Sequence, residues 1–287
     1  MKEKGVMRRR KSAAIAMAIW LGAAPAASAS ELTPATLATF AHYVALSESR
    51  MAADDSAHAG FLWIERLPEP QRSHAFALLR NGEIVIERLE TLENGKPIAV
   101  PGGMIHHWTG TIFIPGVTLQ QTLALMQDYN HHQEYYKPDV VRSKILKRDG
   151  NDFDVELRFH KKKIITSVIE TEHEVHYLPI DATHEESISK STHIHEVESP
   201  GEADEKLKPE GNDRGLLWRI FTYWRFEEKD GGTYVESQSI SLTRDIPAAV
   251  AWLVRGYVES VPRESLRFTL EATRSALLHQ PPPAHGD

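Results

Sequence analysis

The sequence contains no cysteine among its 287 residues. Disulfide bonds, thiolate nucleophiles and cysteine-ligated zinc or iron–sulfur centres are therefore excluded. The sequence also lacks the glycine loop of P-loop proteins, the Gly-x-Gly-x-x-Gly fingerprint of dinucleotide-binding proteins, the Gly-x-Ser-x-Gly elbow of hydrolases and the His-Glu-x-x-His motif of metalloproteases. Stability must come from an apolar core, which a chain of this length is able to bury.

Long apolar runs are absent too, except near the N-terminus. The first eleven residues include six lysines and arginines, and the apolar residues 12–24 follow them. Ala27-Ser28-Ala29 then forms a small-residue cleavage site. This order is typical of a secretory signal peptide, and the apolar run is shorter than the about 20 residues of a membrane span. We expect residues 1–29 to be a signal peptide and the protein to be exported, periplasmic or secreted from a bacterium, without a stable membrane span after cleavage. An uncleaved N-terminal anchor is the alternative.

Positive charge is scarce in the rest of the chain. The whole sequence has a net charge of −7, and residues 1–29 contribute +5 from six basic residues and Glu3, which leaves −12 for the mature part. Nucleic acids and anionic lipid surfaces repel a protein of this charge. We therefore expect no nucleic-acid partner, and the sequence indicates no particular protein partner.

Residues 30–103 form an N-terminal extension that ends at Pro101-Gly102-Gly103. Apolar spacing predicts a helix over 34–50, and a second helix is expected to end near Asn81-Gly82. The remaining elements are short strands over 61–65, 83–92 and 97–100, and the last two form a hairpin across Asn94-Gly95.

Residues 104–279 are more regular, and residues 280–287 are expected to be a disordered tail. A strand over 105–114 leads into a helix that begins at Thr118. A long helix over 246–279 ends the region, and Pro262 should kink or restart it. Between them lie six strands rich in β-branched and aromatic residues, at 141–149, 152–161, 163–178, 184–198, 214–228 and 232–244. The predicted fold class is α+β, a curved antiparallel sheet of about seven strands packed on a long C-terminal helix.

This order of elements resembles the START-like superfamily (SRPBCC, helix-grip), in its polyketide cyclase and coenzyme Q-binding branch. The segments that carry the resemblance are Thr111–Val117, Leu123–Tyr129, Tyr223–Phe226, Gly232–Val235 and the helix Arg255–Ala276. A group of secreted bacterial proteins of unassigned function has a similar layout with such an extension. The resemblance implies an interior cavity between sheet and helix for a lipid, quinone, sterol or polyketide, which is an analogy of fold alone.

Two sets of residues are candidates for the wall of such a cavity. In the last strand, Ser237, Ser239 and Ser241 share one face with Val235 and Thr243, and this face points either to the helix or to solvent. Trp218 and Trp224 share strand parity, and aromatic residues there either pack the core or line a cavity. The predicted ligand-binding residues are Trp108, Tyr136, Trp218, Trp224, Ser237, Ser239, Trp252 and Tyr257.

Histidines and carboxylates suggest alternatives with chemistry. His193 and His195 share a strand face as metal ligands often do, but histidines on a solvated strand surface are the favoured explanation, because isolated pairs are weak signals of a metal site. A cyclase- or hydrolase-type enzyme would need His106, Glu170 and the serines to converge in the cavity. We predict a binding or transport protein for a hydrophobic small molecule, without catalytic residues, metal or cofactor. An envelope interaction protein that docks a partner through residues 30–103 is a third hypothesis.

Overall fold

The computed structural model describes residues 32–56, 60–162, 166–246 and 248–279. Of residues 162, 166, 248–255 and 257–259 it describes the backbone alone, and the predicted signal peptide and tail lie outside the described residues. The elements follow in the order α1 (Pro34–Ser56), η1 (Trp63–Arg66), α2 (Gln71–Arg80), β1 (Val85–Arg88), β2 (Leu92–Glu93), β3 (Lys96–Pro97), β4 (Gly103–Pro115), α3 (Leu119–Met126), η2 (Tyr129–His131), α4 (His132–Tyr135), β5 (Val140–Asp149), β6 (Asp152–Lys162), β7 (Thr166–Pro179), β8 (His184–Glu198), β9 (Lys206–Leu207), β10 (Arg219–Lys229), β11 (Gly232–Arg244) and α5 (Ala248–Leu277).

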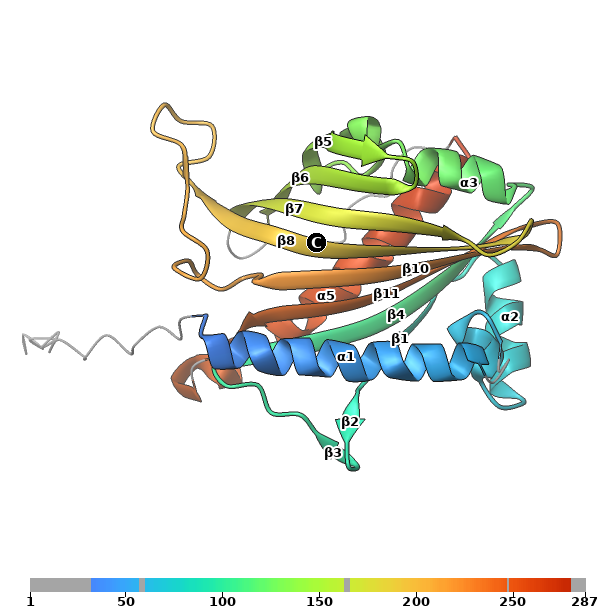
Figure 1. Ribbon diagram of the computed structural model, residues 1–287, viewed down its shortest axis with the longest axis horizontal. Coiled ribbons are helices and arrows are strands. Elements are labelled where there is room, and N and C mark those ends of the chain that lie inside the picture. Colours follow the sequence, from blue (N-terminus) through green and yellow to red (C-terminus); the bar gives the residue numbers. More distant parts are fainter. Residues whose placement is uncertain (1–31, 57–59, 163–165, 247, 280–287) are drawn as a thin grey trace, which may run out of the picture.

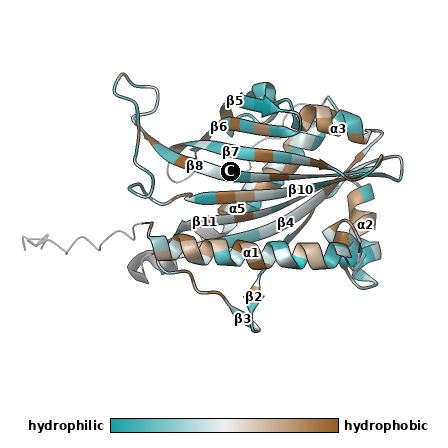
Figure 2. Ribbon diagram, viewed as in Figure 1, coloured by the Kyte–Doolittle hydropathy of each residue, from teal (hydrophilic) through white to brown (hydrophobic). Residues whose placement is uncertain are grey.

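One antiparallel sheet organises the molecule (Figure 1). Its strand order is β1-β4-β11-β10-β8-β7-β6-β5, and the short β9 pairs with β8. The seven strands β4, β5, β6, β7, β8, β10 and β11 match the seven that the sequence predicts, and α5 follows them as the long C-terminal helix. Figure 2 shows both hydrophilic and hydrophobic bands along β6, β7 and β8. The predicted α+β fold class is confirmed.

The inner face of the sheet is the face toward α5, which crosses behind the strands in Figure 1. Leu266 and Leu270 of α5 pack there in one apolar cluster with Ile112, Phe226 and Val235. Gly110 of β4 permits this close approach, because a Cβ atom at this position would lie 2.7 Å from Leu270 Cδ1. The C-terminal half of α5 is thereby fixed against β4 and β11.

The N-terminal extension covers the opposite, outer face of the sheet. Phe40, Tyr43 and Val44 of α1 form one cluster with residues of β10 and β11, including Tyr223 and Ile240. Farther along the sheet, η1 and α2 pack in a second cluster on Phe113 and Tyr234. The strand β1 also joins the edge of the sheet beside β4. The extension is thus part of the same packed body, and the strand β4 already begins at Gly103.

Three details of the predicted elements are wrong. The segment 61–65 contains the 3₁₀ helix η1 in place of a strand, and the carboxylate of Glu65 holds it by accepting from the N–H groups of Phe61 and Leu62. The strand predicted over 214–228 begins only at Arg219, and residues 214–218 before it form no strand. Of the two effects predicted for Pro262, a kink or a restart of the helix, the restart is wrong, because Pro262 lies inside one helix. Among the described residues no helix is long and apolar enough to cross a membrane.

Glu236 fastens η1 to the sheet through a buried carboxylate. Its Oε2 accepts from the N–H of Trp63 at 2.7 Å and from the hydroxyl of Thr111 at 3.1 Å. Burial raises the pKa of Glu236 to about 7, and the nearby Arg225 opposes that rise. Because the folded-state pKa lies above the ordinary value of 4.5, folding favours the protonated carboxyl. Its contribution to stability is complete below pH 4.5 and is lost as the pH rises through 7.

We therefore expect the free energy of unfolding of the wild type to fall relative to Glu236→Gln as the pH rises from 4.5 to 8. The glutamine keeps an acceptor for both donors and does not titrate, so the difference isolates the carboxyl. The shift in the pKa of Glu236 from 4.5 to about 7 corresponds to a loss of about 3 kcal/mol in the free energy of unfolding once the pH is well above 7. Urea unfolding at several pH values measures it, and parallel pH profiles for the two proteins would contradict the assignment.

Candidate functional site

A row of four residues crosses the centre of the inner face. Ser189 of β8 pairs with Thr222 of β10, Thr222 pairs with Ser239 of β11, and Ser239 pairs with Trp108 of β4. Directly paired residues point to the same side of an antiparallel sheet, so all four side chains face α5. With neighbouring strands about 4.8 Å apart, the row is about 14 Å wide. We call these four residues the floor.

The floor is partly exposed although its surroundings are buried. All four floor residues have intermediate exposure. On β8, β11 and β4 the inner-face residues on either side of the floor are buried, namely Ser187, Ser191, Ser237, Ser241, His106 and Gly110. A fully packed layer would bury the middle of each strand at least as well as its neighbours. The floor is therefore less well covered than its neighbours on these three strands, and we call the space above it the hollow.

The floor combines hydroxyl groups with aromatic surface and has no ionisable group of its own. Trp224 of β10, also partly exposed, lies beside Ser237 and stacks on Phe226 with ring centres 6.2 Å apart and planes 2° from parallel. In the row of Phe226, Ile112 and Val235 are fully buried, and Glu185 of β8, which pairs with Phe226, is buried as well. Mostly apolar walls with a few placed polar groups are typical of small-molecule sites.

A buried histidine adjoins the floor from β7. His173 Nδ1 lies 3.3 Å from the hydroxyl of Ser189, and its Nε2 lies 2.9 Å from the hydroxyl of Thr171. Burial lowers the pKa of His173 to about 4, so the imidazole is neutral at neutral pH. His106 of β4 lies next to Trp108 on the inner face. It is likewise neutral at neutral pH, because burial lowers its pKa to about 4. The site therefore offers hydrogen bonds from neutral groups, and the exposed Arg88 of β1, which pairs with Trp108, adds a cation at the edge of the sheet.

The predicted ligand-binding residues divide between several places. Trp108 and Ser239 belong to the floor, and Trp224 and Ser237 lie next to it on the inner face. Tyr136 lies elsewhere, packed with Val140, Phe268 and Ala272, and its hydroxyl is 3.0 Å from that of Thr273. Trp252 and Tyr257 belong to the part of α5 whose side chains lie outside the described residues. A ligand-binding role for any of these residues stays a prediction.

Trp218 is on the wrong face for this site. It is only 1% exposed and packs in the cluster of Phe40, Tyr43 and Val44 under α1. Its indole N–H donates to Asp213 Oδ1 at 3.2 Å. Strand parity with Trp224 fails as a guide because β10 begins at Arg219, so Trp218 belongs to the preceding loop. The structure thus corrects its assignment to the inner cavity.

The residues suggested for an enzyme do not converge. His106 lies on the inner face, where its Nε2 is 3.0 Å from the hydroxyl of Thr243. Glu170 lies on β7, four strands away in the sheet order, and forms ion pairs with Arg142 and with Arg158. Four strand spacings amount to about 19 Å. These residues therefore cannot act together on one substrate atom.

The histidine pair of β8 stands by itself. The rings of His193 and His195 are stacked with centres 6.3 Å apart, and His193 is exposed. Within the described ranges, no three His, Asp or Glu side chains are grouped so that they could hold a metal ion. His193 thus has the exposure of a solvated strand surface, whereas His195 is half-buried with its Nδ1 2.9 Å from the carbonyl oxygen of Lys208.

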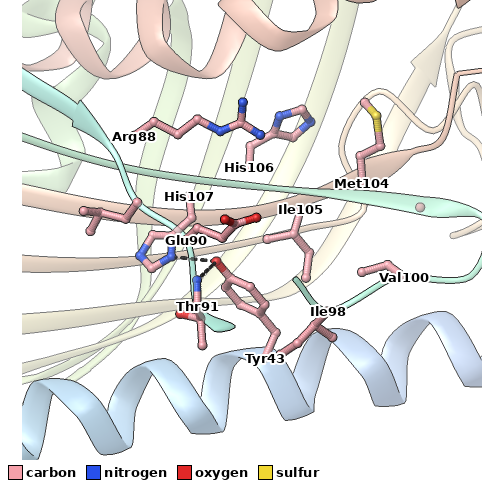
Figure 3. Close-up of a pocket in the computed structure, with 12 residues that line it drawn as sticks. Tyr43, Arg88, Glu90, Thr91, Ile98, Val100, Met104, Ile105, His106 and His107 are labelled. Carbon is pink, nitrogen blue, oxygen red and sulfur yellow. Dashed lines mark hydrogen bonds between the residues drawn. The ribbon is translucent and has the colours of Figure 1, made fainter. Parts of the chain in front are cut away.

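A separate pocket of about 240 Å³ lies between α1, the start of β4 and the segment 88–100 (Figure 3). The hydroxyl of Tyr43 lies 2.9 Å from His107 Nδ1 and accepts from the N–H of Thr91 at 2.9 Å. Burial lowers the pKa of His107 to about 3, so this imidazole is neutral. These polar groups satisfy one another and connect the extension to the sheet, which makes the pocket part of that junction.

Sequence reasoning missed the contribution of β8 and β7. Ser187, Ser189 and Ser191 repeat the alternation of the β11 serines, and this second stripe was the available signal. The flanking Glu186 and Lys190 suggest an ordinary solvated strand. Thr222 and His173 carry no pattern of their own, and only the pairing of β7, β8 and β10 brings them to the floor.

No protein-family profile matches the sequence, and a search of curated proteins finds no match. Solved structures similar in shape include a STAR-related lipid transfer protein from Xanthomonas axonopodis, at 17% identity and a TM-score of 0.41, covering 67% of this chain and 98% of that one. An aromatase/cyclase from a Streptomyces species has 10% identity and a TM-score of 0.42, covering 61% and 95%. A protein from Thermus thermophilus has 15% identity and a TM-score of 0.44, covering 60% and 96%.

Similarity at this level says nothing of ligand or activity, so the fold is assigned from the chain itself. A strand leads through short helices into a run of antiparallel strands, the last strand pairs with the first, and the C-terminal helix packs on the inner face. This is the arrangement that the sequence resemblance implies. The chain therefore has a START-like, helix-grip fold.

Proposed function

We propose that this chain binds a hydrophobic small molecule, with a lipid-, quinone- or polyketide-like body, between the floor and α5. The observation that carries the proposal is the partly exposed floor inside a buried inner face. Trp108 and Trp224 supply flat apolar surface, and the hydroxyls of the floor supply a small number of hydrogen bonds. The signal-peptide pattern supports export, so the periplasmic fraction of expressing bacterial cells is where the loaded protein is sought.

The physical balance favours an uncharged group over the centre of the floor. The groups that adjoin it there are hydroxyls and neutral imidazoles, whereas the exposed Arg88 of β1, which pairs with Trp108, lies at the end of the row. An ionised group placed away from Arg88 would lose its hydration without gaining an opposite charge, which costs several kcal/mol in a buried site. An apolar body gains roughly 25 cal/mol for each Å² of surface removed from water.

Filling the hollow should weaken binding of a neutral apolar dye. N-phenyl-1-naphthylamine is uncharged and fluoresces when it leaves water, so its titration reports occupancy. We expect Ser239→Leu to weaken dye binding at least about tenfold, because the larger side chain occupies the space above the floor. Ser239→Ala is the matched control, since it keeps that space and should bind the dye within about twofold of the wild type.

Circular dichroism and urea unfolding verify that both variants fold. Partial exposure of Ser239 leaves room for the leucine, so the cost in stability should stay under about 1.5 kcal/mol. Unchanged dye affinity in a folded Ser239→Leu protein would overturn the location of the site. Absence of dye binding by the wild type would overturn the function itself.

A further inference from the structure

One arginine lies at the end of the floor. Arg88 of β1 pairs with Trp108 of β4, so its side chain continues the row of the floor by one strand. The strand β1 belongs to the N-terminal extension, which therefore adds a residue to the inner face while its helix α1 packs on the outer face. Arg88 is exposed, so water reaches this end of the row.

The guanidinium of Arg88 is not engaged within the protein. In the part of the chain that the structure describes, it forms no hydrogen bond and no ion pair. By contrast, Arg225 on the outer face forms ion pairs with Asp55 and Glu186 at 2.8 and 2.9 Å. The N–H donors of Arg88 are therefore open to a ligand.

A pocket adjoins this end of the floor. The pocket of about 240 Å³ in Figure 3 is lined by Arg88 and His106, which are the inner-face neighbours of Trp108 across the sheet and along β4. Figure 3 shows Arg88, His106 and Met104 on one side of β4 and Tyr43 on the other. The inner wall of the pocket therefore continues the floor beyond Trp108.

The charges at this wall suit a single negative charge. His106 is neutral at neutral pH, because burial lowers its pKa to about 4 and the charge of Arg88 lowers it further. Glu90 also lines the pocket and carries the opposite sign to Arg88, so it opposes a second negative charge. A carboxylate carries one charge, and its two oxygens match the planar fork of a guanidinium.

We propose that the ligand is an amphiphilic carboxylic acid, whose carboxylate binds Arg88 and whose apolar body lies over the floor. This inference rests on the proposed binding site. A carboxylate over the hydroxyls of the floor would lose its hydration without a cationic partner, whereas at the exposed end it keeps part of its hydration and gains one. The acid therefore lies along the row in one direction, from Arg88 toward Ser189.

Decanoic acid and decanamide are the matched probes, because they share the same chain and only the acid is ionised at neutral pH. Each is titrated against the protein loaded with N-phenyl-1-naphthylamine, and displacement of the dye gives its affinity. The wild type should prefer decanoate by about fivefold at low salt, the equivalent of one partly exposed ion pair. The preference should shrink at high salt, because ions screen an exposed pair.

Three substitutions assign the preference to its residues. Arg88→Gln should abolish it, so that the two probes bind within about twofold of each other. Glu90→Gln should raise it by about twofold, because the substitution removes a carboxylate from the same pocket. Arg72→Gln is the matched control, since Arg72 lies on α2 and pairs with Glu69, and it should keep the fivefold preference.

The possible failures are distinguishable. Equal affinity of the wild type for decanoate and decanamide would overturn the carboxylate inference while the dye still reports a binding site. A preference that persists in Arg88→Gln, or an equal loss of both probes in that variant, would leave Arg88 without a role in carboxylate binding and also overturn it. Failure of the dye itself to bind the wild type would overturn the proposed function instead.

Discussion

Deletion of residues 32–102 is expected to leave a chain that does not fold. Without the extension, the outer face of β10 and β11 exposes Tyr223, Ile240 and Leu242, which α1 now covers. Phe113 and Tyr234 lose η1 and α2 in the same way. Each buried large apolar side chain contributes about 1.5–3 kcal/mol, and a domain has a net stability of only about 5–15 kcal/mol. Far-ultraviolet and near-ultraviolet circular dichroism together measure the loss.

Lys96→Ala is the control for this deletion, because Lys96 is an exposed residue of the small hairpin β2–β3 within the extension. It should leave the urea midpoint unchanged within about 0.5 kcal/mol. A cooperatively folding, dye-binding fragment 103–287 would contradict the prediction. Such a fragment would also revive the hypothesis that residues 30–103 are a detachable docking module, which their shared core with the sheet now argues against.

The strands were predictable because their local signals agree with one another. Runs of β-branched and aromatic residues are separated by turns at Gly150 and at Asp230-Gly231, and all three residues have the positive φ that such turns require. β8 keeps its predicted bounds of 184–198. The outer-face packing of α1 was not predictable, since an amphipathic helix shows which side it buries but not which of the two sheet faces receives it.

The site was only half predictable for a similar reason. The serine stripe of β11 is visible in the sequence, and the structure directs it toward α5. The stripe of β8 is equally regular, but its charged neighbours Glu186 and Lys190 suggest a solvated strand. The serines of β8 and of β11 belong to one floor because β10 lies between these two strands in the sheet. No local sequence pattern encodes this strand order.

The two tryptophans of the β10 region should separate stability from binding. Trp218 is among the largest fully buried side chains and supports α1, so we expect Trp218→Ala to lower the free energy of unfolding by about 3–5 kcal/mol. The surviving folded protein should bind N-phenyl-1-naphthylamine as the wild type does, since the indole lies on the outer face. Urea unfolding and dye titration on the same samples measure both quantities.

Trp224→Ala should have the opposite profile. Trp224 is partly exposed beside the floor, so its truncation should cost less stability than that of Trp218 and should weaken dye binding by about tenfold. Trp218→Phe serves as the conservative control, because it keeps an aromatic ring under α1 while removing the N–H to Asp213 and part of the indole. A Trp218→Ala protein of nearly normal stability that no longer binds the dye would return Trp218 to the ligand site. The contrast between the two positions is therefore a direct test of which face of the sheet binds the ligand.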